Sequence, residues 1–208
     1  MKSKLLFLFV LAIFMTSCSQ KEMKISRSDY SVETEIDDFS PAYILKNDEG
    51  ETELLQNSLI GNTNWVLSVE RDLTLSEVAP FLQELTEKKF QKDGVHEDTK
   101  DIYFVYSDTL HQQNAYVKLP FKSVFAEPRG MMEPTEYFFQ LIDLITDEVS
   151  GLKDFKQRFA EAVENRESYE GIIIDFSDKM TVEEFVNILI EFERLNISDK
   201  IVERTFIY

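Results

Sequence analysis

The chain has few of the residues on which most enzyme chemistry depends: one cysteine, two histidines and six glycines among 208 residues. One cysteine cannot form a disulfide within the chain, so packing must stabilise the fold. The histidines, His96 and His111, stand in predicted loops without the closely spaced ligands that a zinc site needs. The glycines form no Gly-rich loop that would hold a phosphate or a dinucleotide. The sequence therefore predicts no metal and no cofactor.

Basic residues are also scarce, with 22 Lys and Arg against 39 Asp and Glu, so the net charge is −17. Nucleic acid is disfavoured as a partner, because binding to phosphates needs a basic surface. Apolar residues, in contrast, make up 43% of the chain and include 17 Phe, which is enough for a folded core. The acidic charge either keeps the protein soluble or attracts a basic partner.

The N-terminus has the layout of a secretory signal. Lys2 and Lys4 precede an unbroken apolar run at 5–15, and small residues follow up to Cys18. The apolar run is too short to span a membrane, which takes about 20 residues in a helix. We therefore expect this segment to be removed rather than kept as an anchor.

This arrangement resembles the signal of bacterial lipoproteins, in which a peptidase cuts before a cysteine that then carries lipid. The resemblance implies a signal peptide at 1–17 and acyl chains, such as palmitate, on Cys18. It covers the signal only, and Met15 stands where the family usually has Leu. Ser19 is not the Asp associated with inner-membrane retention, which favours the outer membrane. The alternative is an ordinary cleaved signal followed by an incidental cysteine.

After the signal, the pattern predicts an α+β fold made of two βαβ-like units with a helical middle segment, in which helices pack on a mixed sheet. We expect a polar tether at 18–40, in which Tyr30, Val32 and Ile36 would add an edge strand. A first α/β unit follows at 41–124, and a helical segment with a second βαβ unit at 125–208. Predicted strands lie at 42–46, 52–56, 65–69, 102–106, 115–121, 172–176 and 202–208. The acidic loop Asn47-Asp48-Glu49-Gly50 between the first two predicts that they form a hairpin.

Two helices are predicted from capping boxes, in which a Thr and the Glu three residues later satisfy each other's backbone. Thr74 with Glu77 opens one, and Thr181 with Glu184 opens the other. Pro80 predicts a kink in the first helix or a later start of its regular part. Apolar residues at helical spacing predict two more helices at 138–149 and 152–166.

The two units align without a gap, residues 65–85 on residues 172–192. Four of the twenty-one positions are identical: Thr74 with Thr181, Glu77 with Glu184, Leu82 with Leu189 and Glu84 with Glu191. Either the units are a duplication or they share only the common pattern of a strand, a turn and a capped helix.

The second unit, together with the helix predicted before it, resembles the periplasmic domain of the ExbD/TolR family. The residues that carry the resemblance are Ile172-Ile173-Ile174-Asp175 and Leu195-Asn196-Ile197, within roughly a quarter of the chain. The resemblance implies a related scaffold, one that binds envelope partners in that family. The family's membrane helix carries an ionisable Asp, and the run at 5–15 has none, so a proton-coupling role does not carry over.

Carboxylates are the remaining candidates for chemistry. Asp175 and Asp178 follow a predicted strand, and Asp72 holds a similar place in the first unit, with Glu70 beside it. Ligands often bind at such strand ends, and a hydrolase with paired carboxylates would need these acids to face one cleft. Acids before a helix also stabilise its dipole without any chemistry.

The aromatic residues of the middle segment (Tyr137, Phe138 and Phe139), together with Phe121 and Phe125, either form a binding patch or pack in the core. We therefore predict a lipid-anchored envelope protein that acts as a non-enzymatic binding or assembly subunit on an unidentified envelope protein. The alternative function is a carboxylate-dependent envelope hydrolase. A third hypothesis is an immunity or stress lipoprotein that shields a partner with its acidic face, which a contiguous acidic patch would support.

Overall fold

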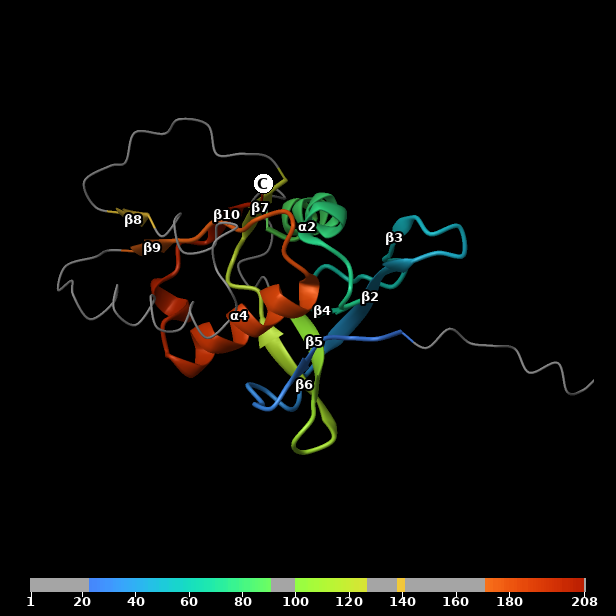
Figure 1. Cartoon of the computed structure of the whole chain (residues 1–208), viewed down its shortest axis with the longest axis horizontal. Helices are drawn as coiled ribbons and strands as arrows, with labels where there is room; N and C mark the ends of the chain where they lie inside the picture. The colour runs from blue at the N-terminus through green and yellow to red at the C-terminus, as the bar shows by residue number, and fades with distance from the viewer. Residues whose placement is uncertain (1–22, 91–99, 127–137, 141–170, 208) are drawn as a thin grey trace, which may run out of the picture.

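The computed structural model describes residues 23–90, 100–126, 138–140 and 171–207. Within them, a mixed sheet and a smaller set of parallel strands pack around two α-helices (Figure 1). This confirms the predicted α+β class with a mixed sheet packed by helices. The signal segment and Cys18 lie outside the described residues, and so does most of the predicted helical middle segment.

The first sheet has six strands in the order β3–β2–β4–β5, with β6 on the other side of β5 and β1 beside its second half. Strands β1, β2, β4 and β5 are parallel to one another, whereas β3 and β6 are antiparallel to their neighbours. The strands are β1 Arg27–Ser28, β2 Phe39–Lys46, β3 Thr52–Leu55, β4 Asn64–Val69, β5 Ile102–Asp108 and β6 Gln113–Lys118. They confirm the strands predicted in the first unit.

The predicted hairpin between β2 and β3 is confirmed. The side chain of Asn47 accepts hydrogen bonds from the amides of Glu49, at 3.0 Å, and Glu51, at 2.9 Å. Gly50 has a φ of +85°, a conformation that side chains other than glycine rarely adopt. The acidic turn therefore closes because an Asn and a Gly stand at the two positions that need them.

Both predicted capping boxes open helices. Helix α2, Leu75–Phe90, begins directly after Thr74 and continues through Pro80, so the later start proposed for it is wrong. Pro80 is exposed, which places its missing backbone N–H on the solvent side of the helix. Helix α4, Val182–Arg194, begins after Thr181 and buries an apolar face that includes Phe185 and Phe192.

A second group of strands is parallel. Strand β7, Ser123–Phe125, pairs with β10, Arg204–Phe206, and strand β8, Phe138–Gln140, pairs with β9, Gly171–Ile173. A parallel bridge between Phe176 and Ile207 joins the continuation of β9 to the end of β10. The second βαβ unit is therefore present. The helix predicted from residue 138 is wrong at its start, where the chain forms β8, and its remaining positions fall outside the described residues.

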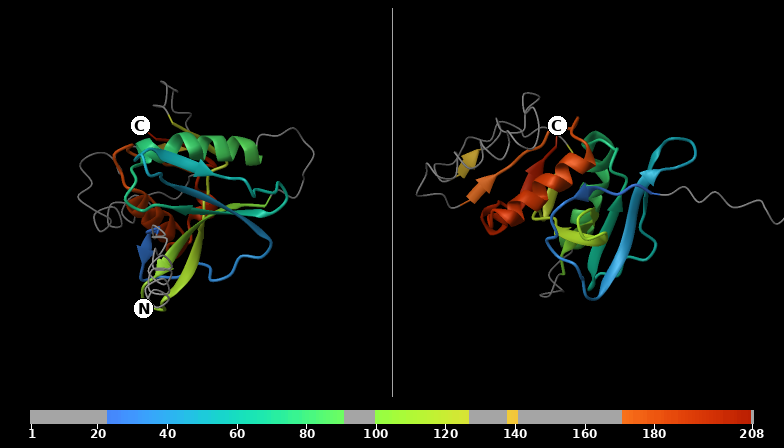
Figure 2. Two further views of the ribbon diagram at one scale, coloured as in Figure 1. Left: turned by 90° about the vertical axis from the view of Figure 1, so that its right-hand side faces the viewer. Right: turned by 60° about the horizontal axis from the view of Figure 1, so that its bottom comes forward.

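The helices lie between the two groups of strands (Figure 2). Phe185 of α4 packs edge-to-face against Phe104 of the first sheet, with ring centroids 5.8 Å apart, and against Phe176 of the second group, at 4.8 Å. Buried residues of both units belong to one continuous hydrophobic core. The units are therefore joined by packing rather than only by the chain.

The two units also meet backbone to backbone where their helices begin. The amide of Leu75 donates to the carbonyl of Met180 at 2.7 Å, and the amide of Val182 donates to the carbonyl of Leu73 at 2.8 Å. In the ungapped alignment, Leu73 corresponds to Met180 and Leu75 to Val182, so each of the two hydrogen bonds is the counterpart of the other. The contact is thus locally two-fold symmetric, in the register that the sequence alignment predicts.

Candidate functional site

The three acids singled out from the sequence lie near the junction of the two units, but they differ in how far they are exposed. The Asp72 side chain is 70% exposed and lies 3.6 Å from the guanidinium of Arg71. Asp178 is partly exposed, and its backbone carbonyl accepts from the amide of Ser76. Asp175 is buried, and its carboxylate accepts from the amide of Phe206 in β10 at 3.3 Å.

These positions do not supply the arrangement of a carboxylate hydrolase. Asp175 faces the interior while Asp72 faces solvent, so the two carboxylates do not flank a common substrate position. Glu70 accepts from the amide of Lys46 and thereby ties β2 to β4. Among the described residues, no group of three His, Cys, Asp or Glu side chains gathers to hold a metal ion. The described geometry therefore gives the hydrolase alternative no support.

A hollow of about 260 Å³ lies where β5 begins and β6 ends. Four of its five charged lining residues pair with each other, Lys118 with Asp101 at 2.8 Å and Lys122 with Glu203 at 2.6 Å, and the fifth is Asp199. Because the paired charges already neutralise one another, the hollow offers a charged ligand little to bind. None of the predicted acids lines it.

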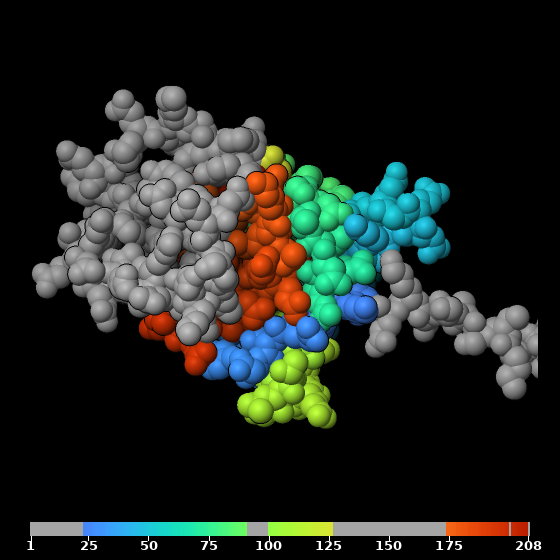
Figure 3. All heavy atoms as spheres, viewed as in Figure 1, coloured from blue at the N-terminus to red at the C-terminus, as the bar shows by residue number. Residues whose placement is uncertain are grey.

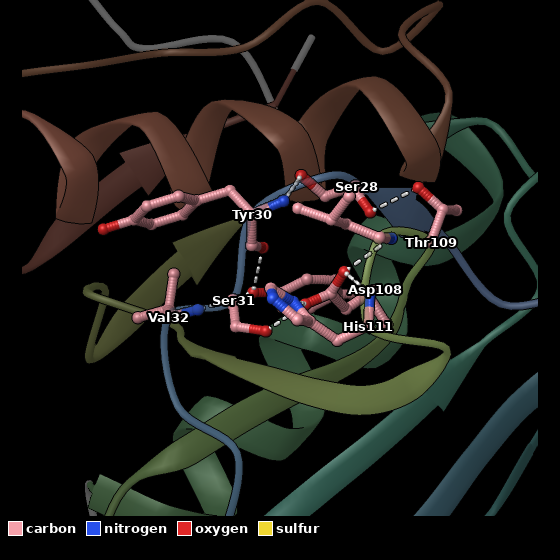
Figure 4. Close-up of polar contacts among 9 residues, drawn as sticks. Ser28, Tyr30, Ser31, Val32, Asp108, Thr109 and His111 are labelled. Carbon is pink, nitrogen blue, oxygen red and sulfur yellow. Dashed lines mark hydrogen bonds and ion pairs between the residues drawn. The ribbon is translucent and has the colours of Figure 1, made fainter.

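A buried carboxylate that the sequence reading missed holds the N-terminal segment in place. Asp108, at the end of β5, has a fully buried side chain (Figure 4). Its Oδ1 accepts from the amides of Leu110, at 2.8 Å, and His111, at 3.0 Å. Its Oδ2 accepts from the hydroxyl of Ser31 and lies 2.7 Å from Nδ1 of His111. We call Ser31, Asp108 and His111 the clip.

The clip contains the residue types of a catalytic triad in an order that does not serve catalysis. In a triad, the histidine stands between the serine and the acid, because it must take the serine proton. Here Asp108 stands between Ser31 and His111, and both contact the same carboxylate oxygen. The arrangement therefore fixes the chain rather than activating a nucleophile.

The carboxylate of Asp108 stays ionised at ordinary pH. The Ser31 hydroxyl, followed by the His111 amide, holds the pKa of Asp108 well below its usual range, although burial acts in the opposite direction. Because the folded pKa lies below the unfolded value of about 3.9, the clip stabilises the fold above about pH 4. That contribution is lost as the pH falls below this value, through the folded pKa.

Sequence signals for the clip are uneven. An Asp that precedes a turn between two strands commonly accepts from amides two and three residues on, so Asp108 could be predicted as a turn residue. Ser31 lies 77 residues away in the chain and gives no such signal. The prediction that His111 is a surface residue agrees with its exposed side chain, but its contact with Asp108 was missed.

A second feature missed from the sequence is the side of the first sheet that faces away from the helices, which we call the outer face. Helix-side residues such as Ala42 and Ile44 are fully buried, whereas Phe39 and Tyr43 on the opposite side of β2 are 49% and 41% exposed. Leu55 of β3, 42% exposed, pairs directly with Tyr43. Three large apolar side chains therefore stand on one face at or near the sheet edge.

Acidic residues flank both ends of this face. Glu35, Asp37 and Asp38 precede β2, and the turn between β2 and β3 contains Asp48, Glu49 and Glu51. All six are exposed. Figure 3 shows the β2–β3 turn projecting from the body of the molecule. An apolar stripe with acidic ends is complementary to a segment that is apolar in the middle and basic around it.

Two of the aromatic residues considered from the sequence lie elsewhere. Phe121 is fully buried and packs edge-to-face against Phe176, with ring centroids 5.8 Å apart. Phe125 is half-buried and stacks on Phe206, at 4.8 Å. Both contribute to packing, so neither forms the binding patch considered for them.

Comparison with protein-family models, with curated proteins and with solved structures finds no match for this chain. The resemblances to lipoprotein signals and to the ExbD/TolR domain therefore stay predictions. Within the described part of the chain, no helix is long and apolar enough to cross a membrane.

Proposed function

We propose that this chain is a lipid-anchored cell-envelope protein, attached through Cys18 and favoured for the outer membrane, that acts as a non-enzymatic binding subunit. The observation that carries the proposal is the outer face of the first sheet. Phe39, Tyr43 and Leu55 are 41–49% exposed there, whereas Ala42 and Ile44 on the helix side of β2 are fully buried. Apolar side chains grouped on one exposed face mark an interaction surface more often than scattered ones do.

The chemistry of this face names the kind of partner. Aromatic residues are enriched in interfaces, because they bury a large apolar area with few rotatable bonds. The acidic turns at both ends steer basic groups toward the face and disfavour acidic ones. We therefore propose an envelope protein with a basic, apolar segment as the partner.

Photo-crosslinking from defined positions tests this function. A photoreactive amino acid replaces Tyr43 on the outer face in one variant and Glu87, an exposed residue of α2, in another. The proposal predicts that one protein is captured from position 43 in intact cells and not from position 87. The crosslinked peptide of that protein should carry net positive charge.

Charge reversal supplies the matched control. Glu51→Lys and Glu87→Lys change the net charge by the same amount, but only Glu51 lies beside the outer face. Capture from position 43 should fall in Glu51→Lys and persist in Glu87→Lys. Equal capture from both photoreactive positions, or capture of an acidic peptide, contradicts the proposal.

A further inference from the structure

The N-terminal segment is part of the fold from Lys24 onward, although the sequence places it in a tether that extends to residue 40. The carbonyl of Lys24 accepts from Arg71, just after β4, and the carbonyls of Ser26 and Ser28 accept from Ser107 and Thr109 at the end of β5. These bonds are 2.8–2.9 Å long. The segment therefore lies between the ends of β4 and β5 as an inserted strand.

Further contacts hold the residues that follow β1. The phenol of Tyr106 donates to the carbonyl of Tyr30 and accepts from the amide of Val32, both at 2.9 Å. The clip fixes Ser31 on the buried carboxylate of Asp108 (Figure 4). Next along the chain, Glu33 exchanges two backbone hydrogen bonds with Tyr116 of β6. The segment is thus tied to the sheet at each step between residues 24 and 33.

This attachment limits how far the domain can stand from a lipid on Cys18. Lys24 is six residues beyond Cys18, and an extended chain of that length spans at most about 20 Å. If the segment were free as far as β2, the reach would be about 70 Å for 21 residues. Docking of the segment therefore removes most of the possible tether.

The place where the N-terminal segment enters the sheet also determines from which face of the sheet the preceding residues approach. Strands β4 and β5 pair with each other as far as Leu67 and Phe104, so the segment must reach their ends from one face of the sheet. The first turns of α4 contact the chain at this point on the helix side, where the Glu183 amide donates to the Arg71 carbonyl and the Asn187 side chain donates to the Arg27 carbonyl. The start of the described chain accordingly lies beside β2, on the side away from the helices, in both Figure 1 and Figure 2.

We propose that the docked N-terminal strand holds the outer face of the first sheet toward the bilayer, with Lys24 within about 20 Å of the lipid on Cys18, so that the partner is itself a membrane-bound protein. This inference rests on the proposed lipid anchor at Cys18. Lipid headgroups are a poor occupant of the outer face, because its acidic ends repel anionic lipids. A basic protein segment that lies close to the membrane surface fits both the charge and the position.

Energy transfer from the domain to the membrane tests the orientation. The full-length protein, processed in cells, is reconstituted into phosphatidylcholine vesicles that contain an acceptor dye on the headgroups. Because lipid would occupy the only native cysteine, an introduced cysteine takes a single donor dye. Glu51→Cys places it beside the outer face, and Leu195→Cys places it at the end of α4, at the opposite side of Figure 1. Transfer from position 51 should exceed transfer from position 195.

Two further variants isolate the strand. A flexible Gly/Ser insertion of about 20 residues after Gln20 lengthens the tether without touching the fold, and should abolish the difference between the two positions. Asp108→Ala should reduce the difference by loosening the segment. The insertion keeps the test decisive if Asp108→Ala fails to fold.

Measuring the intact mass of the protein distinguishes failure of the proposed lipid anchor from failure of the proposed orientation. A chain without acyl groups would overturn the lipid anchor and the orientation together. An acylated chain with equal transfer from positions 51 and 195, or with a difference that survives the insertion, would overturn the orientation alone and leave the binding function standing.

Discussion

The two βαβ-like units follow one plan, yet among the residues that the structure describes the features on which the proposed function rests lie in the first unit. In both, a parallel strand leads through a Thr-capped turn into a helix, and the helix starts exchange hydrogen bonds symmetrically. The first unit is extended by β3, β6 and the inserted β1, and it holds the outer face and the clip. Added edge strands, rather than the shared core, therefore distinguish the first unit, which carries the proposed binding face, from the second.

The helix starts differ in a way that the sequence hides. At Thr181, the hydroxyl accepts from the amide of Glu184 at 3.3 Å, while the Glu184 carboxylate accepts from the amide of Thr181 at 2.8 Å. At Thr74, the carboxylate of Glu77 accepts from the amide at 2.9 Å and also from the Thr74 hydroxyl at 3.0 Å. The second box is therefore complete and reciprocal. In the first, the Glu77 amide donates to the Thr74 carbonyl rather than to its hydroxyl, so only the half made by the Glu77 carboxylate is present.

The substitution with the largest expected effect on stability tests whether the two units unfold together in one cooperative transition. Phe185→Ala removes a ring that packs against both Phe104 and Phe176, and should cost about 3–5 kcal/mol of unfolding free energy. The measurement is urea unfolding followed by circular dichroism. Phe125→Ala, at a half-buried ring, is the control and should cost less. Two separate transitions in the native protein would show that the units unfold independently.

An intermediate effect on stability is expected in the last turn of α2, which has no counterpart in the shorter helix α4. The buried ammonium of Lys89 donates to the carbonyls of Gly61, at 2.9 Å, and Thr63, at 2.6 Å, and lies 4.7 Å from the centre of the Trp65 ring. Lys89→Met leaves both carbonyls without this donor and should cost about 1–3 kcal/mol. The exposed neighbour gives the control, Lys88→Met, with an effect below about 0.5 kcal/mol.

The loss of stability in Lys89→Met should also depend on pH. Burial lowers the pKa of Lys89 to about 8, below its unfolded value of about 10.4. The unfolded chain therefore binds more protons between these values, and the native protein gains stability as the pH rises through them. The stability gap between the native protein and Lys89→Met should widen from about pH 8 to about pH 10. A gap that narrows over this range would contradict the burial of the ammonium.

The smallest effect compares the two caps directly. Thr181→Ala should cost about 1 kcal/mol, because it leaves a helix amide without its acceptor. Thr74→Ala should cost only a few tenths of a kcal/mol, because Glu77 still satisfies the Thr74 amide. Thermal unfolding of the two variants, measured side by side, gives the difference. Equal losses would show that the two boxes are energetically alike despite their geometry.

Local patterns in the sequence predicted most of the described fold. The hairpin around Asn47 and Gly50, the strands of the first sheet and both helix starts depend on neighbouring residues, and the structure has them where the patterns placed them. The start of β8 was predicted as helix, because Phe138 begins an apolar spacing that suits a helix as well as a short buried strand. Pro80 suggested a later helix start, but it is exposed and α2 includes it.

The clip and the outer face could not be predicted in the same way, because each depends on contacts between distant parts of the chain. The clip brings together Ser31 and Asp108 across 77 residues. Phe39 and Tyr43 alternate along β2 with residues that are buried. The sequence does not say which of these two sets of side chains faces the helices, so the outer face could not be identified from it. The predicted acids, in contrast, were chosen for their place at strand ends, and the structure separates Asp175 from Asp72.

The anchor is the claim on which both proposals depend, and intact mass measures it most directly. The full-length protein is expressed with its own signal and weighed from the membrane fraction beside a Cys18→Ala control. The account predicts the mass of residues 18–208 plus acyl chains, and the loss of that species in the control. An uncut chain, or a cut chain with an unmodified cysteine, would contradict it.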